Sequence, residues 1–235
     1  RSAAPHRRAH RRLGATMGAF RSAMASRTPP SPSASALERL LGEVRHCRLC
    51  ADRLPHPPRP VLQLGATARV LVAGQAPGRR VHLSGIPFDD PSGERLRDWM
   101  GVDTRTFYDP RAVALLPMGL CYPGTGPGGD LPPRPECAPA WRAALLAQLP
   151  QVELVLAVGR HAQAWHLGPA ARTTLTETVR AWRDGGPGLL PLPHPSPRNN
   201  RWLRNNPWFE HEVLPALRAR VAAALARPPA RNPWP

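Results

Sequence analysis

The stretch that decides the fold is 70-VLVAGQAPGRRVHLSGIPFDDPSG-93, where an apolar run is followed by a loop rich in glycine and proline. The four apolar residues before Gly74 show no alternation, which is typical of a strand buried on both faces of a parallel sheet. Ligands of such sheets bind at the carboxyl ends of the strands. We therefore expect the loop Gly74-Gln75-Ala76-Pro77-Gly78 at a binding site, with Phe88 as a stacking surface. A tight strand-to-helix turn beside a core phenylalanine is the alternative.

Outside this stretch, predicted strands and helices alternate along the chain. Strands are predicted at residues 112–120, 152–158 and 189–192. Helices are predicted at residues 35–45, 92–100, 138–149, 160–165, 173–183 and 207–225, the last with a kink at Pro215. Alternation with right-handed crossovers predicts an α/β fold of three layers (αβα) around a four-stranded parallel sheet.

The composition of the chain favours an anionic partner. The 235 residues suit one domain with tails, and their formal net charge is +16, with arginine as the only strongly basic residue type. Nucleic acid is the usual partner of such a basic chain. The alternative is compositional drift in a GC-rich genome, which produces arginine, alanine and proline whatever the function.

The charge pattern also divides the chain. Residues 1–34 carry seven arginines and no acid, so we expect a disordered extension, a domain at 35–226 and a disordered tail at 227–235. The extension is similar to a transit peptide, or is an upstream addition with the true start at Met17 or Met24. No apolar run approaches the roughly 18 residues of a membrane span. We expect a monomer in the cytoplasm (bacterial cytosol or nucleoid) without a membrane partner.

All four cysteines fall beside loops at predicted helix boundaries. Cys47 and Cys50 form a Cys-x2-Cys pair, and Cys121 and Cys137 follow in a separate segment. Thiolates from two segments can close a tetrahedral zinc site or hold a 4Fe-4S cluster, and ligand identity alone does not choose between them. Because no cysteine is left over, we expect a metal or cluster site rather than chance placement.

Five short motifs occur in a fixed order over residues 36–217. They are Cys47-x2-Cys50, Gly74-Gln75-Ala76-Pro77-Gly78, Gly85-Ile86-Pro87-Phe88, the pair Cys121 and Cys137, and His194-Pro195-Ser196. In these motifs the chain resembles the iron-sulfur (family 4) uracil-DNA glycosylases and, more loosely, the wider uracil-DNA glycosylase superfamily. The resemblance implies that superfamily's fold and a 4Fe-4S cluster on the four cysteines, with structural zinc as the alternative.

The resemblance also implies a pocket for a base flipped out of DNA. Such a base lies against an aromatic ring and is hydrogen-bonded along its edge. Phe88 matches the family's stacking phenylalanine, and Gly74, Gln75 and Ala76 lie in the loop that faces the base. His194 matches the histidine that donates to the pyrimidine O2, where negative charge collects as the N-glycosidic bond breaks. A histidine that caps a turn is the alternative.

The segment after His194 is similar to a loop that probes the duplex. It reads 196-SPRNNRWLRNN-206, and we expect Ser196, Arg198, Asn199, Asn200 and Arg201 to contact DNA. Trp202 and Leu203 either wedge into the base stack or belong to the core with Trp208 and Phe209. Arg198 stands where many superfamily members carry an apolar wedge.

The chain departs from the family at groups that serve the reaction. Gln75 stands where the family has glutamate, and Pro117 where it has an asparagine near the base. Asp89 and His82 are the predicted replacements: a carboxylate beside the stacking ring can orient water or stabilise the sugar cation, and histidine is a base near neutral pH. The alternative for Asp89 and Asp90 is capping of the helix at 92–100, which suits Asp90 better.

The leading functional hypothesis is a monofunctional DNA glycosylase that hydrolyses the N-glycosidic bond of uracil or a related deaminated base. The second is a uracil- or lesion-binding protein of the same fold with little or no activity, which the missing glutamate would explain. The third is a zinc-stabilised nucleic-acid-binding module unrelated to base excision.

Overall fold

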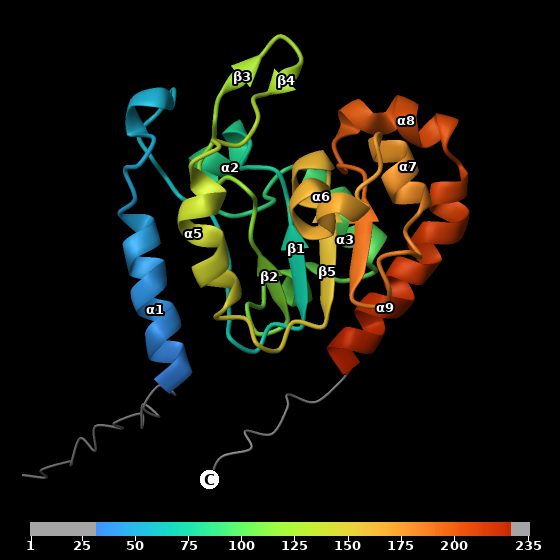
Figure 1. Ribbon diagram of the computed structural model, residues 1–235, viewed down its shortest axis with the longest axis horizontal. Helices are drawn as coiled ribbons and strands as arrows, with labels where there is room; N and C mark the ends of the chain where they lie inside the picture. Colours follow the sequence, from blue (N-terminus) through green and yellow to red (C-terminus); the bar gives the residue numbers. More distant parts are fainter. Residues whose placement is uncertain (1–31, 227–235) are drawn as a thin grey trace, which may run out of the picture.

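The computed structural model describes residues 32–226, which form a parallel sheet with helices on both faces (Figure 1). The strands of this sheet are β1 (Val70–Ala73), β2 (Val113–Leu115), β5 (Leu154–Val158) and β6 (Leu189–Leu192). Their order is β2-β1-β5-β6, and every neighbouring pair is parallel. The predicted α/β class and the four-stranded parallel sheet are confirmed.

Nine α-helices lie within the described residues. They are α1 (Pro32–Arg45), α2 (Arg79–Ser84), α3 (Pro91–Met100), α4 (Thr104–Phe107), α5 (Cys137–Leu146), α6 (Arg160–Leu167), α7 (Leu175–Arg180), α8 (Asn200–Asn205) and α9 (Leu214–Ala226). The sequence analysis did not predict α2, α4 or α8. The predicted boundary before residue 35 falls inside α1, and the predicted extension and tail otherwise lie outside the described residues. No helix within 32–226 is long and apolar enough to cross a membrane.

Side chains of each strand alternate between two apolar cores. Val70 and Val72 pack in a core with residues of α3, α7 and α9, whereas Leu71 packs with residues of α1 and α5. Because both faces of every strand are covered, the strands are apolar throughout rather than alternating with polar residues.

The last helix, for which a kink at Pro215 is predicted, has an irregular turn directly before this proline. A π-helix spans Phe209–Val213 and leads directly into α9, so Pro215 is the second residue of α9. The Leu214 amide donates to the Phe209 carbonyl, five residues back, so the regular α-helical hydrogen-bond pattern is already interrupted directly before the proline. Phe209 at the start of the π-helix is fully buried and packs edge-on against Trp99.

Strand order places a binding crevice above β1. The chain passes from β1 to β2 on one side and later reaches β5 on the other, and the carboxyl ends of strands diverge at such a switch point. A short hairpin of β3 (Thr125–Gly126) and β4 (Gly129–Asp130) rises beside these carboxyl ends, with α8 beyond β6 (Figure 1). This hairpin lies in a segment for which no helix or strand was predicted.

Candidate active site

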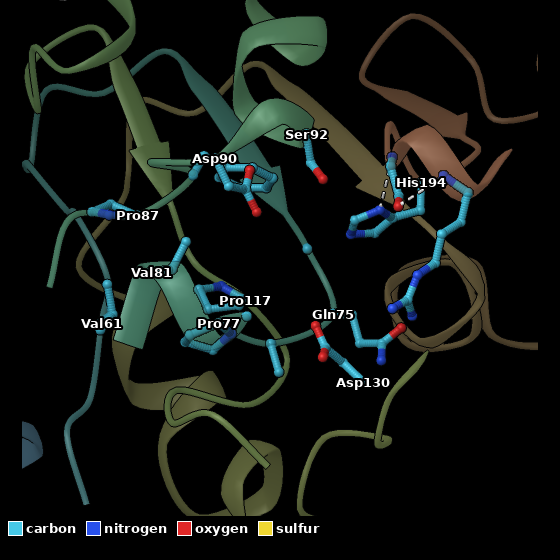
Figure 2. A pocket seen from close by; sticks show the side chains of 16 residues that line it. Val61, Gln75, Pro77, Val81, Pro87, Asp90, Ser92, Pro117, Asp130 and His194 are labelled. Carbon is cyan, nitrogen blue, oxygen red and sulfur yellow. Dashed lines mark hydrogen bonds between the residues drawn. The ribbon is translucent and has the colours of Figure 1, made fainter. Parts of the chain in front are cut away.

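A cavity of about 230 Å³ lies at the carboxyl ends of β1 and β6 (Figure 2). The loop after β1 lines one wall, from Gly74 to Gly78. Phe88 and His194 line it from two other segments, so the structure brings together all five residues predicted to bind the base: Gly74, Gln75, Ala76, Phe88 and His194.

Phe88 is held in the cavity by two glycines. Its φ is +57°, in the left-handed region that residues with a side chain rarely adopt. A Cβ on Gly93 would lie 1.8 Å from the Phe88 carbonyl oxygen, and one on Gly74 would lie 3.2 Å from the tip of the ring. The ring packs edge-on against Phe107 at 6.0 Å. Backbone strain therefore accompanies a side chain that faces the cavity, a combination common at functional sites.

This strain predicts an unusual order of stability for two variants of Phe88. Glycine adopts the left-handed conformation without the steric cost that alanine pays there, about 1 kcal/mol. We expect Phe88→Gly to be more stable to urea than Phe88→Ala by about this amount. A matched pair at Phe107, which is not at positive φ, should show the reverse order. Equal or reversed stabilities at Phe88 would contradict a strained Phe88.

His194 follows β6 and directs Nε2 into the cavity (Figure 2). The backbone amide of Ser196 donates to its Nδ1 at 3.2 Å, so the neutral ring carries its proton on Nε2. Burial lowers the pKa of His194 from 6.5, and the nearby carboxylates of Asp90 and Asp130 oppose this shift without cancelling it. At neutral pH, His194 is thus an uncharged hydrogen-bond donor that faces the cavity.

Two carboxylates face the same cavity from different walls (Figure 2). Asp90 is the N-cap of α3 and accepts from the Gly93 amide at 2.9 Å, as predicted for Asp90. Asp130 belongs to β4. A side chain built on Gly78 would begin 3.3 Å from Asp130 Oδ2 and 4.0 Å from Asp90 Oδ2, so both acids reach the end of the loop after β1.

The site lies inside a region that matches a known family. The family model described as the uracil DNA glycosylase superfamily matches residues 62–218. The chain belongs to this superfamily. Members of this superfamily act on DNA, and the expected chemistry of a superfamily site is the release of a base. Cys121 and Cys137 lie inside the matched range, whereas Cys47 and Cys50 precede it.

Asp89 and His82, the two residues predicted to activate water, do not line the cavity. Asp89 lies in an outer groove beside Tyr108. His82 lies in α2, where its ring stacks on that of His56 at 5.1 Å and lies tilted to that of Tyr122 at 6.0 Å. Burial, with His56 and Arg59, lowers the pKa of His82. Neighbouring acids in a sequence differ in direction, and the structure turns Asp90 rather than Asp89 toward the cavity.

The segment predicted to probe the duplex is helical, with a 3-10 turn at Pro197–Asn199 followed by α8. Ser196 and Arg198 line the cavity, and Asn200 and Arg201 are exposed. Asn199 instead donates its amide to the His194 carbonyl at 2.7 Å, which braces the loop that carries His194.

The aromatic residues of this segment pack against the core. The indole N–H of Trp202 donates to Thr176 Oγ1 at 2.8 Å, and Trp202 and Leu203 both pack against the buried cluster that contains Phe209. The core alternative for these two residues describes the structure better than a wedge that enters the base stack.

All four cysteines line a second cavity, between the end of α1 and the start of α5. None forms a disulfide. The indole N–H of Trp141 donates to Cys47 Sγ and the Leu120 amide to Cys137 Sγ, both at 3.3 Å. Burial raises the pKa of Cys121 to about 12 and that of Cys137 to about 11, and the other thiols add to both shifts.

Within residues 32–226, no three His, Cys, Asp or Glu side chains are grouped so that they could hold one metal ion. Because the pKa values of Cys50, Cys121 and Cys137 are raised, these three thiols remain protonated unless a cationic centre binds them, since thiolates are the form that ligates metal.

The sequence analysis did not identify Asp130 as an acid of the cavity, and it identified Asp90 only as a helix cap. Asp130 follows a glycine-rich stretch, 126-GPGG-129, that gives a turn signal but no sign of where the turn leads. In the cap, only Oδ1 of Asp90 accepts from the Gly93 amide, which leaves the second carboxylate oxygen, Oδ2, to face the cavity. Ser92, in the first turn of α3, also lines the cavity.

Proposed function

We propose that the protein is a monofunctional DNA glycosylase that hydrolyses the N-glycosidic bond of uracil or a related deaminated base flipped out of DNA. The observation that carries the proposal is the neutral His194, whose Nε2–H faces a cavity that Phe88 also lines. As the bond breaks, negative charge collects on the departing base, and a fixed donor at that charge lowers the barrier. Phe88 offers the ring on which the base stacks.

Hydrolysis also requires a water molecule and a group that orients it. Asp90 and Asp130 line the same cavity as His194, so carboxylates are present although Gln75 replaces the glutamate of family 4.

The second candidate function is uracil or lesion binding with little or no hydrolysis. Gln75 favours it, because this amide donates to the Leu131 carbonyl at 3.1 Å and has no carboxylate to offer.

We also propose that Cys47, Cys50, Cys121 and Cys137 hold a 4Fe-4S cluster, which would place the chain in the family 4 branch. Support comes from their shared cavity and the two N–H donors to sulfur. When bound, it would supply a cross-link between the end of α1, the loop after β2 and the start of α5.

The test is base release from synthetic oligonucleotides. Single- and double-stranded DNA with one uracil, hypoxanthine or xanthine is incubated with the protein and then treated with hot alkali, which cleaves at abasic sites. We expect cleavage at a deaminated base and none in the matched oligonucleotide with an undamaged base. A mobility shift without alkali-labile sites would support the binding function instead. Because arginines contact phosphates, the affinity should fall steeply as salt rises.

A further inference from the structure

The hairpin of β3 and β4 is fastened beside the active-site cavity at two points. Gln75 donates its side-chain amide to the Leu131 carbonyl at 3.1 Å, which ties the hairpin to the loop after β1. The guanidinium of Arg198 lies against Gly129, where a Cβ would be 1.9 Å from Nη1. Gly129 also has a φ of +119°, which favours glycine. The hairpin is thus built to meet the loop that carries His194.

The last residue of this hairpin is Asp130, and a relay of hydroxyls orients its carboxylate. Thr125 donates its hydroxyl to Asp130 Oδ1 at 3.2 Å across the hairpin. Because that proton is committed, the buried Tyr122 hydroxyl is the donor to Thr125 Oγ1, at 2.5 Å. One oxygen of Asp130 is therefore held, while Oδ2 lies near Gly78 at the cavity wall.

Asp130 differs from the other acids near the site. Asp90 is engaged as the N-cap of α3, where its Oδ1 accepts from the Gly93 amide. Asp89 lies outside the cavity. In the described part of the chain, no cationic side chain lies within ion-pair distance of Asp130. Its oxygen Oδ2 is thus available to accept a proton.

We infer that Asp130 is the catalytic base, which activates the water that attacks C1′ of the flipped nucleotide. The inference rests on the proposed function and names a residue for it in a segment far from the loop where the family keeps its acid. As the C1′–N bond breaks, its electron pair leaves with the base and is stabilised at O2 by His194 Nε2–H. The water oxygen bonds to C1′, and Asp130 accepts the proton that the water loses. The products are an abasic sugar and a base anion that solvent protonates.

Single-turnover base release by Asp130→Asn tests the inference. Asparagine keeps the shape of the side chain and accepts from Thr125, but it cannot take the proton. We expect the rate to fall about 100-fold, within the usual range for loss of a general base. The affinity for DNA that contains the damaged base should stay within about threefold, because the phosphate contacts are unchanged.

Four further variants separate catalysis from structure. Asp89→Asn lies outside the cavity and should stay within about threefold of the original rate, whereas Asp90→Asn, which keeps a capping residue, should lose less activity than Asp130→Asn. Thr125→Val should slow release several-fold, and it should add nothing on the Asp130→Asn background, since it acts through Asp130. Asp130→Glu should recover part of the rate if the carboxylate matters.

The outcomes are distinct. If the unmodified protein releases base and Asp130→Asn releases it at a rate within threefold, the role of Asp130 is overturned while the proposed function stands. A large loss of rate confined to Asp90→Asn has the same consequence. If the unmodified protein releases no base from any oligonucleotide, the proposed function fails and this inference fails with it. Thermal unfolding of Asp130→Asn at the original temperature excludes loss of fold as the cause.

Discussion

Replacing His194 with alanine is expected to slow base release by about 10²–10³-fold under single-turnover conditions. A second hydrogen bond, from the Ser196 amide to Nδ1, fixes the Nε2–H donor of this ring, which lines the cavity. Its removal takes away a donor that is already oriented where charge develops, and water that replaces it must reorganise. The measurement is the rate of alkali-labile site formation with protein in excess.

Two further variants sharpen the test. His194→Gln keeps an amide donor of similar reach and is expected to retain more activity than His194→Ala. His211→Ala changes an exposed histidine in the π-helix and should leave the rate unchanged. If His194→Ala releases base within threefold of the unmodified rate, His194 does not stabilise the leaving base.

The same histidine predicts the direction of the pH dependence. Burial lowers the pKa of His194 from 6.5 in the folded protein, so the unfolded chain binds this proton more readily. Its contribution to stability is fully present above pH 6.5 and is lost as the pH falls through the lowered pKa. His166, beside Arg142, has its pKa lowered to about 4 by burial and acts in the same direction. In His194→Ala, the loss of stability between pH 7 and pH 5 should therefore be smaller.

The sequence was sufficient to predict the sheet and the loop that lines the cavity. Strands covered on both faces are continuous apolar runs, and the carboxyl end of β1 follows from Gly74 directly. Helix α2 was missed because Arg79, Arg80 and His82 leave Val81 as the one buried residue in six, so no apolar period is visible. Short elements that neighbouring loops hold in place give little signal of this kind.

The acids of the cavity depended on tertiary structure. Asp89 and Asp90 are adjacent, and the direction of each was set by the left-handed turn at Phe88, which in turn requires Gly93. Asp130 reaches the cavity through strands of two residues each, too short for alternation to be read. Local patterns thus predict which segments form the site better than which side chains enter it.

Replacing Cys50 with serine is expected to abolish metal binding and to lower the unfolding temperature of the protein. The four thiols join segments that are otherwise connected by long stretches of chain. A cross-link between such segments contributes about 2–4 kcal/mol. For a domain of this size, its loss corresponds to a drop of about 5–15 °C. Absorbance near 400 nm, iron and zinc content, and the unfolding temperature are the measurements.

A control within the same cavity is Trp141→Phe, which removes the N–H donor to Cys47 Sγ but keeps all four thiols. It should retain iron, with a cluster that is lost faster in air, because hydrogen bonds to sulfur tune such a centre. A colourless protein with one zinc per chain would replace the cluster with a zinc site, and a protein free of both metals would contradict the metal assignment.

The cysteine cavity and the base cavity have separate linings, so a Cys50→Ser protein that remains folded should still release base. Loss of activity without loss of fold would contradict a purely structural centre.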